Sequence, residues 1–140
     1  MKKLFTIITI ITALFSLSAI HAEDKPALDG YCPVCYISAG KAVEGKPEHS
    51  ASYKGKTYHF VSDDVKKTFI KEPTKWLPQY DGYCAYGIAK GKKVESDPKI
   101  FTVYEGKLYL NKSKNIGNRF DKKPQVYIKD ADARWARRKK

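Results

Sequence analysis

The chain has 140 residues and a formal net charge of +12 at pH 7, with 27 Lys and Arg against 15 Asp and Glu. This length fits one compact domain. The basic residues are scattered, apart from a denser run at 134–140, and form no recognisable reader motif, which disfavours nucleic-acid binding. Such a surface is typical of a soluble basic protein that could approach anionic lipid headgroups.

Residues 1–22 are predicted to form a signal peptide. Lys2 and Lys3 precede an apolar stretch from Leu4 to Leu17, and small residues lead to Ala22. Cleavage is expected after Ala22, with Ala19 as the alternative. The apolar run is short for a membrane span, so an uncleaved anchor is the less favoured interpretation. The mature chain, 23–140, is therefore predicted to be periplasmic or secreted and not integral to the membrane.

The mature sequence contains an internal repeat, in which residues 29–78 match residues 81–129. Asp29-Gly30-Tyr31-Cys32 recurs as Asp81-Gly82-Tyr83-Cys84. After one deleted residue the matched positions stay 51 apart, from Gly40 and Gly91 onward. So regular a correspondence indicates a duplicated unit. Each unit is too small to fold stably by itself, so the two are expected to share a core.

The first unit is expected to open with a loop over residues 29–35. Alternating apolar residues then predict strands over 49–53 and 57–61, joined by a turn at Lys54-Gly55-Lys56. Ser62 is a predicted helix cap, and Pro73 ends that helix. An apolar turn at Trp76-Leu77 follows.

The second unit repeats this plan, with predicted strands over 100–104 and 108–111 and a helix over 113–120. A further helix is expected over 126–138. The ten Tyr and two Trp are attributed mainly to core packing. The sequence thus predicts an α+β fold of two pseudo-repeated units, each a small β-hairpin with short helices, sharing one core.

The run from Tyr53 to Ser62, followed by Phe69 and Pro73, resembles the YHS domain. The opening Cys-Pro-Val-Cys at 32–35 and the run Gly-Tyr-Cys-Ala-Tyr-Gly at 82–87 are similar to exported bacterial members of that family. The resemblance covers nearly all of the mature chain. It implies, as for the similar TRASH-type modules, binding of soft or transition metals through cysteine. Val61 and Val65, however, stand where the Cys-rich members carry ligands.

Three cysteines remain as candidate metal ligands. Cys32 and Cys35 form a C-x-x-C pair, a spacing that can put two thiolates on one ion. Cys84 is at the matching place of the second unit and would complete a three-sulfur site if the two opening loops meet. Such a donor set suits Cu(I) or Zn(II). His59, on a predicted strand, is a weaker candidate ligand, because a partly buried or surface histidine is the favoured explanation for it.

Three other interpretations of the thiols stay open. In an oxidising compartment, Cys84 could form a disulfide with Cys32 or Cys35 and staple the units together, or could be a small buried apolar residue. A thioredoxin-type redox pair is the third interpretation. That motif belongs at a strand-to-helix junction of a parallel sheet, and the sequence indicates neither the helix nor the sheet.

The sequence shows no catalytic constellation, phosphate loop or H-E-x-x-H motif, so the protein is not expected to be an enzyme. The leading prediction is a metal carrier or buffer whose partners are a copper or zinc ion and, as a further candidate, a periplasmic protein. The alternative is a disulfide-stapled module that binds a protein or small molecule without metal. A thiol–disulfide oxidoreductase is the third option.

Overall fold

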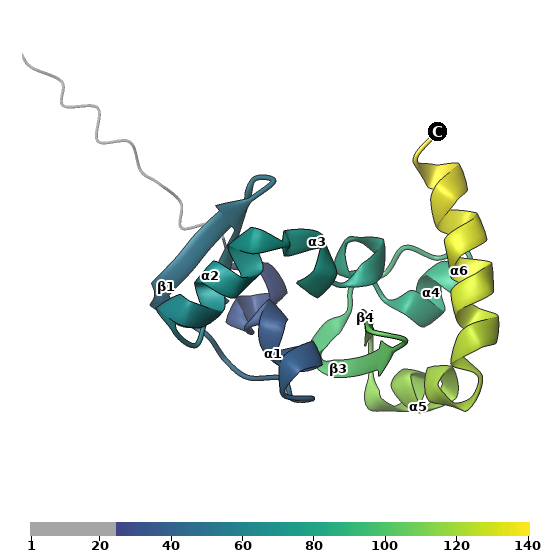
Figure 1. The fold of residues 1–140 in the computed structure, drawn as a ribbon. Helices are drawn as coiled ribbons and strands as arrows, with labels where there is room; N and C mark the ends of the chain where they lie inside the picture. The colour runs from purple at the N-terminus through teal and green to yellow at the C-terminus, as the bar shows by residue number, and fades with distance from the viewer. Residues whose placement is uncertain (1–24) are drawn as a thin grey trace, which may run out of the picture.

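A computed structural model describes residues 25–140, so the predicted signal peptide lies outside the described residues. The fold is α+β, as predicted, with helices and two small antiparallel sheets of two strands each. The two halves of the chain lie side by side, the first in purple to teal and the second in green to yellow (Figure 1). None of the helices in residues 25–140 has the length and hydrophobicity needed to cross a membrane.

The first half contains six elements: η1 (Ala27–Gly30), α1 (Pro33–Ser38), β1 (Lys46–Tyr53), β2 (Lys56–Phe60), α2 (Asp63–Lys71) and α3 (Pro73–Trp76). The second half repeats their order: η2 (Gln79–Gly82), α4 (Ala85–Ala89), β3 (Asp97–Tyr104), β4 (Lys107–Asn111), α5 (Lys114–Lys122) and α6 (Pro124–Arg138). The predicted hairpins and the helices at 113–120 and 126–138 are confirmed, with slightly longer bounds.

The two hairpins share their irregularities as well as their order. Each first strand slips in register at the same place, between Lys46 and Ser50 in β1 and between Asp97 and Phe101 in β3. Their turns also match: Lys54 and Glu105 both have φ of 48°, and the glycine that follows each is also at positive φ. Two positive φ values at a two-residue turn are typical of the type I′ connection that matches strand twist.

The helices that follow the hairpins begin in the same way. The Ser62 hydroxyl accepts a hydrogen bond from the Val65 amide at 3.2 Å, and the Ser113 hydroxyl accepts one from the Ile116 amide at 3.3 Å. Each serine thereby satisfies an amide that has no partner within its helix. The predicted cap at Ser62 is therefore confirmed.

The buried residues form three clusters. One belongs to the first half and includes Cys32, Phe60 and Phe69; a second belongs to the second half and includes Tyr80 and Phe120. The third joins Tyr36 of α1 to Leu108 and Leu110 of β4. The Tyr36 hydroxyl also donates to the Pro98 carbonyl at 2.7 Å. The halves thus share a core through α1 and the second hairpin.

Two short helices were not expected from the sequence. The predicted opening loop over 29–35 instead leads at Cys32 into α1, and α4 begins after Cys84. Pro33 is at the first helical position of α1, where its missing N–H costs nothing. Six and five residues are too few to show helical periodicity, and burial of these helices supplies the stability that their local sequence lacks.

Candidate functional site

Cys32 and Cys35 lie together at the start of α1 and are both buried. Burial raises the pKa of the Cys35 thiol to about 12, and the Cys32 thiol within hydrogen-bonding reach raises it further. Cys35 is therefore a protonated thiol at neutral pH. The C-x-x-C pair does precede a helix, contrary to expectation, but the sheets of residues 25–140 are antiparallel rather than the parallel sheet of a thioredoxin-type site.

Cys84 has different neighbours in the second half. Its thiol donates to the Asn111 side-chain oxygen at 3.5 Å and accepts from the Gly87 amide at 3.4 Å. The same Asn111 oxygen accepts the Tyr86 amide at 3.0 Å.

Gly87 occupies the position that Cys35 has in the first half. A Cβ atom there would lie 2.8 Å from the Val94 side chain and 3.0 Å from the Lys92 carbonyl oxygen. The second half consequently has no room for a second thiol beside Cys84, whereas the first half accommodates Cys35.

His59 lies on β2 and is partly exposed, while its neighbours Tyr58 and Phe60 are buried. This alternation is the one predicted for the strand. The ring lies over the backbone of η1, since a Cβ atom at Gly30 would be 3.4 Å from His59 Nδ1.

The structure does not show the three sulfurs gathered at one site, and the three-sulfur metal centre stays a prediction. In residues 25–140 no group of three or more His, Cys, Asp or Glu side chains is arranged to hold a metal. The physical reason is that Cys32 and Cys35 pack in the first half's own cluster, while Cys84 is engaged by Asn111. All three thiols are free in this structure, and the alternative of one disulfide from Cys84 to Cys32 or Cys35 likewise stays a prediction.

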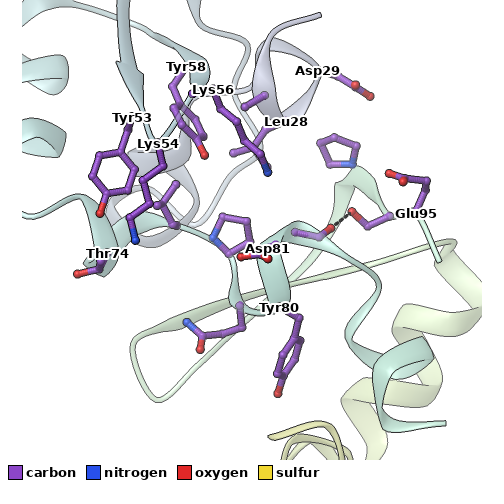
Figure 2. Close-up of a pocket in the computed structure, with 18 of the residues that line it drawn as sticks. Leu28, Asp29, Tyr53, Lys54, Lys56, Tyr58, Thr74, Tyr80, Asp81 and Glu95 are labelled. Atoms are coloured by element: carbon purple, nitrogen blue, oxygen red, sulfur yellow. Dashed lines mark hydrogen bonds between the residues drawn. The ribbon is translucent and has the colours of Figure 1, made fainter. Parts of the chain in front are cut away.

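A groove with a volume of about 1080 Å³ is lined by residues of both halves. The first half contributes the tip of its hairpin together with η1, and the second half contributes η2 and one side of α6. In Figure 2, Tyr53, Lys54, Lys56 and Tyr58 lie on one side, Asp29 and Glu95 on another, and Asp81 between them.

Left-handed backbone is concentrated around this groove. Six non-glycine residues of the described chain have positive φ, and all of them except Glu105 line the groove: Leu28, Asp29, Lys54, Tyr80 and Asp81. For leucine and tyrosine this conformation is sterically unfavourable, at a cost on the order of 1–2 kcal/mol per residue. Strained backbone of this kind clusters at functional sites.

The walls of the groove combine balanced charge with aromatic rings. Four lysines face four acids, namely Lys25, Lys54, Lys56 and Lys139 with Asp29, Asp81, Glu95 and Asp132. The rings are those of Tyr53, Tyr58, Tyr80 and Trp135. Several of these groups are held in place: Lys25 pairs with Asp29 at 2.7 Å, and the Tyr80 hydroxyl donates to Asp132 at 2.8 Å.

Two tyrosines of the groove, Tyr58 and Tyr80, have a raised pKa and keep their protons at neutral pH. Burial raises the pKa of Tyr58, and the negative charge of Asp81 raises it further. Burial also raises the pKa of Tyr80, with its hydrogen bond to Asp132 as the next cause. The Tyr58 hydroxyl can therefore donate to a ligand or its water, whereas the single O–H of Tyr80 is already donated to Asp132 and its oxygen can only accept.

Sequence reasoning missed this groove because it assigned the tyrosines and tryptophans to the core. Leucine and tyrosine do not favour positive φ, so the residue types at positions 28 and 80 do not predict it. The signal that was present is the repeated Asp-Gly at 29–30 and 81–82, a dipeptide that favours left-handed turns.

Comparison of the chain with protein-family models gives no match, and comparisons with curated proteins and with solved structures give no significant match either. The resemblance to the YHS domain therefore stays a prediction from the motifs quoted above.

Proposed function

We propose that this protein is a non-enzymatic binding protein, acting in the periplasm or as a secreted protein, whose ligand site is the groove between the halves. The observation that carries the proposal is the convergence of five left-handed non-glycine residues, from both halves, on one groove. Lys54 is accounted for by the turn of the first hairpin, since its equivalent Glu105 has the same φ outside the groove. The positive φ of Leu28 and Tyr80, whose side chains do not favour that region, is the part of the observation that supports a preorganised binding site.

The lining favours a small polar ligand that carries a ring, such as a sugar. The partly exposed rings of Tyr53 and Trp135 can stack on the apolar face of such a ring. Carboxylates such as Asp81 accept hydrogen bonds from hydroxyl groups, and lysines such as Lys56 donate to ring or hydroxyl oxygens. The volume of about 1080 Å³ is at the upper end of the usual range for ligand sites.

The non-enzymatic part of the proposal is supported by the chemistry of the groove walls. They offer lysines, carboxylates and tyrosine hydroxyls that are paired with one another, as in Lys25–Asp29 and Tyr80–Asp132. A nucleophile activated by a neighbouring base is the arrangement that turnover would require. The one His–Asp pair among the described ion pairs, His49–Asp63, is not part of the groove lining.

Thermal-shift titration with a panel of neutral sugars, sugar phosphates, amino acids and dipeptides tests the proposal. At least one class is expected to raise the Tm saturably, because a ligand that binds only the folded state stabilises it. The repeat supplies a matched control: Lys56→Gln should weaken that shift, while Lys107→Gln, at the equivalent position of the second hairpin and outside the groove, should not. Equal effects of the two variants, or no saturable shift from any class, would overturn the groove as the site.

A second candidate function is favoured by the contact between the Cys32 and Cys35 thiols. Two adjacent thiols could bind a soft ion such as Cu(I) with two sulfur ligands once both protons are displaced, which keeps the predicted role of metal carrier or buffer. Cu(I) competition titration separates this from the groove: Cys35→Ser should abolish high-affinity binding and Cys84→Ser should leave it unchanged. Loss of Cu(I) affinity in the Cys84 variant would instead restore the three-sulfur hypothesis.

A further inference from the structure

A smaller hollow opens beside the groove at the end of α6. It has a volume of about 340 Å³ and is lined by Asp81, Lys93, Trp135, Arg138 and Lys139. Asp81, Trp135 and Lys139 also line the groove, so a single ligand could reach both. The two hollows nevertheless differ in charge, because the groove is balanced whereas the smaller hollow has three cations and one carboxylate.

The cations of the smaller hollow are held by specific contacts. Arg138 donates from Nη2 to the Gly91 carbonyl at 3.0 Å, which leaves the rest of its guanidinium free. The Lys93 ammonium is 4.5 Å from the centre of the Tyr83 ring, and the Lys139 ammonium is 5.9 Å from that of Trp135. These two rings pack against each other at 6.4 Å between centres. An aromatic pair thus positions one ammonium group on each ring.

Ordinary structural roles explain only part of this arrangement. Basic residues at the C-terminal end of α6 interact favourably with the helix dipole, which accounts for Arg138 and Lys139. Lys93 lies in the segment between α4 and β3, outside α6, so the dipole of α6 does not explain why it lies near Arg138 and Lys139. Within residues 25–140, none of the three cations takes part in an ion pair, so their charge is available to a ligand.

We propose that this hollow is an anion subsite that takes the phosphate monoester group of the ligand whose ring lies in the groove. This inference rests on the proposed function and names its substrate class. One guanidinium fork and two separate ammonium groups match an anion with three outward oxygens better than a planar carboxylate. The carboxylate of Asp81 lies at the junction of the two hollows, where it would accept from a hydroxyl of the ring rather than face the phosphate.

Isothermal titration of the purified protein with inorganic phosphate, glucose and glucose 6-phosphate tests the subsite. Glucose 6-phosphate is expected to bind at least tenfold more tightly than glucose. Arg138→Gln and Lys93→Gln should each reduce the affinity for glucose 6-phosphate about fivefold to tenfold and leave glucose unchanged. Lys93→Gln guards against a folding effect, because the Lys93 side chain does not tie α6 to its neighbours. Lys112→Gln, an exposed lysine outside both hollows, is the charge-matched control.

The outcomes distinguish this inference from the proposed function. Equal affinities for glucose and glucose 6-phosphate, with both weakened by Lys56→Gln, would overturn the subsite and leave the groove intact. Binding of glucose 6-phosphate that depends on Arg138 but not on Lys56, together with no binding of glucose, would support the subsite while the groove proposal fails. Vesicles of phosphatidylcholine with or without phosphatidic acid show whether the phosphate belongs to a lipid headgroup. No phosphate-dependent binding in any arm, or equal loss in the Lys112 variant, would refute the subsite.

Discussion

Cys32 and Cys84 occupy equivalent positions of the two halves but have different neighbours, because a few positions around them carry different residues. In the first half Cys32 has a second thiol beside it, because Cys35 fits where the second half can accommodate only Gly87. In the second half, Asn111 takes the strand position of Phe60 and accepts hydrogen bonds from both Cys84 and the backbone. A buried amide in place of a phenyl ring thus converts Cys84 into a hydrogen-bonded structural residue.

At this scale the pKa of Cys35 gives a prediction about pH. Because burial raises it from 9.0 to about 12, the protonated thiol is favoured in the folded state. Its contribution to stability is therefore fully present below pH 9 and is lost as the pH rises toward 12. Guanidinium denaturation at pH 7 and pH 10.5 should show a smaller loss of stability in Cys35→Ala than in the unmodified protein.

Thiol labelling provides the independent check on the same residue. At pH 8 the native Cys35 should react with iodoacetamide far more slowly than the same thiol in guanidinium, since the thiolate is the nucleophile and the side chain is buried. Native labelling at the rate of free cysteine would contradict both the burial and the raised pKa.

At the scale of elements, the two hairpins and their capped helices follow local rules. Ser62 and Ser113 cap the helices that the hairpins lead into, and each hairpin turns over two residues of positive φ. The exceptions are the first turn residues, Lys54 and Glu105, because neither side chain favours the left-handed region that asparagine tolerates.

Replacing the first residue of the second turn should therefore stabilise the protein. Glu105→Asn is expected to raise the free energy of unfolding by about 0.5–1 kcal/mol, because asparagine favours the first position of a type I′ turn. Urea denaturation measures the change. Glu105→Ala removes the same charge without the left-handed preference and should be neutral or destabilising, so equal stabilities of the two variants would refute the turn argument.

At the scale of the whole molecule, the cluster of Tyr36, Leu108 and Leu110 makes the halves depend on each other. α1 is covered by the second hairpin, where the Tyr36 ring meets Phe101 at 5.0 Å between centres. If the halves separated, the apolar side chains of this cluster would be exposed to water and the hydrogen bond from the Tyr36 hydroxyl to the Pro98 carbonyl would be lost. The groove exists only in the joined molecule, because both halves form its walls.

Neither half is therefore expected to fold alone. A fragment of residues 25–78 should lack native helicity and cooperative melting in circular dichroism, because a chain of that size buries too little apolar surface without its partner. Mixing it with residues 79–140 should restore part of both signals. A cooperative transition in the first fragment by itself would show that the shared cluster is dispensable.

The sequence by itself determined the repeat, the hairpins and the capped helices, because alternation, turn residues and capping side chains act over a few neighbouring positions. Only the tertiary structure decided where the cysteines lie relative to one another. Their positions depend on how the halves dock and on the hydrogen bond between Cys84 and Asn111. The same holds for the groove. Leu28 and Tyr80 adopt left-handed backbone against their own local preference, and in the sequence only the Asp-Gly that follows each of them indicates such a turn.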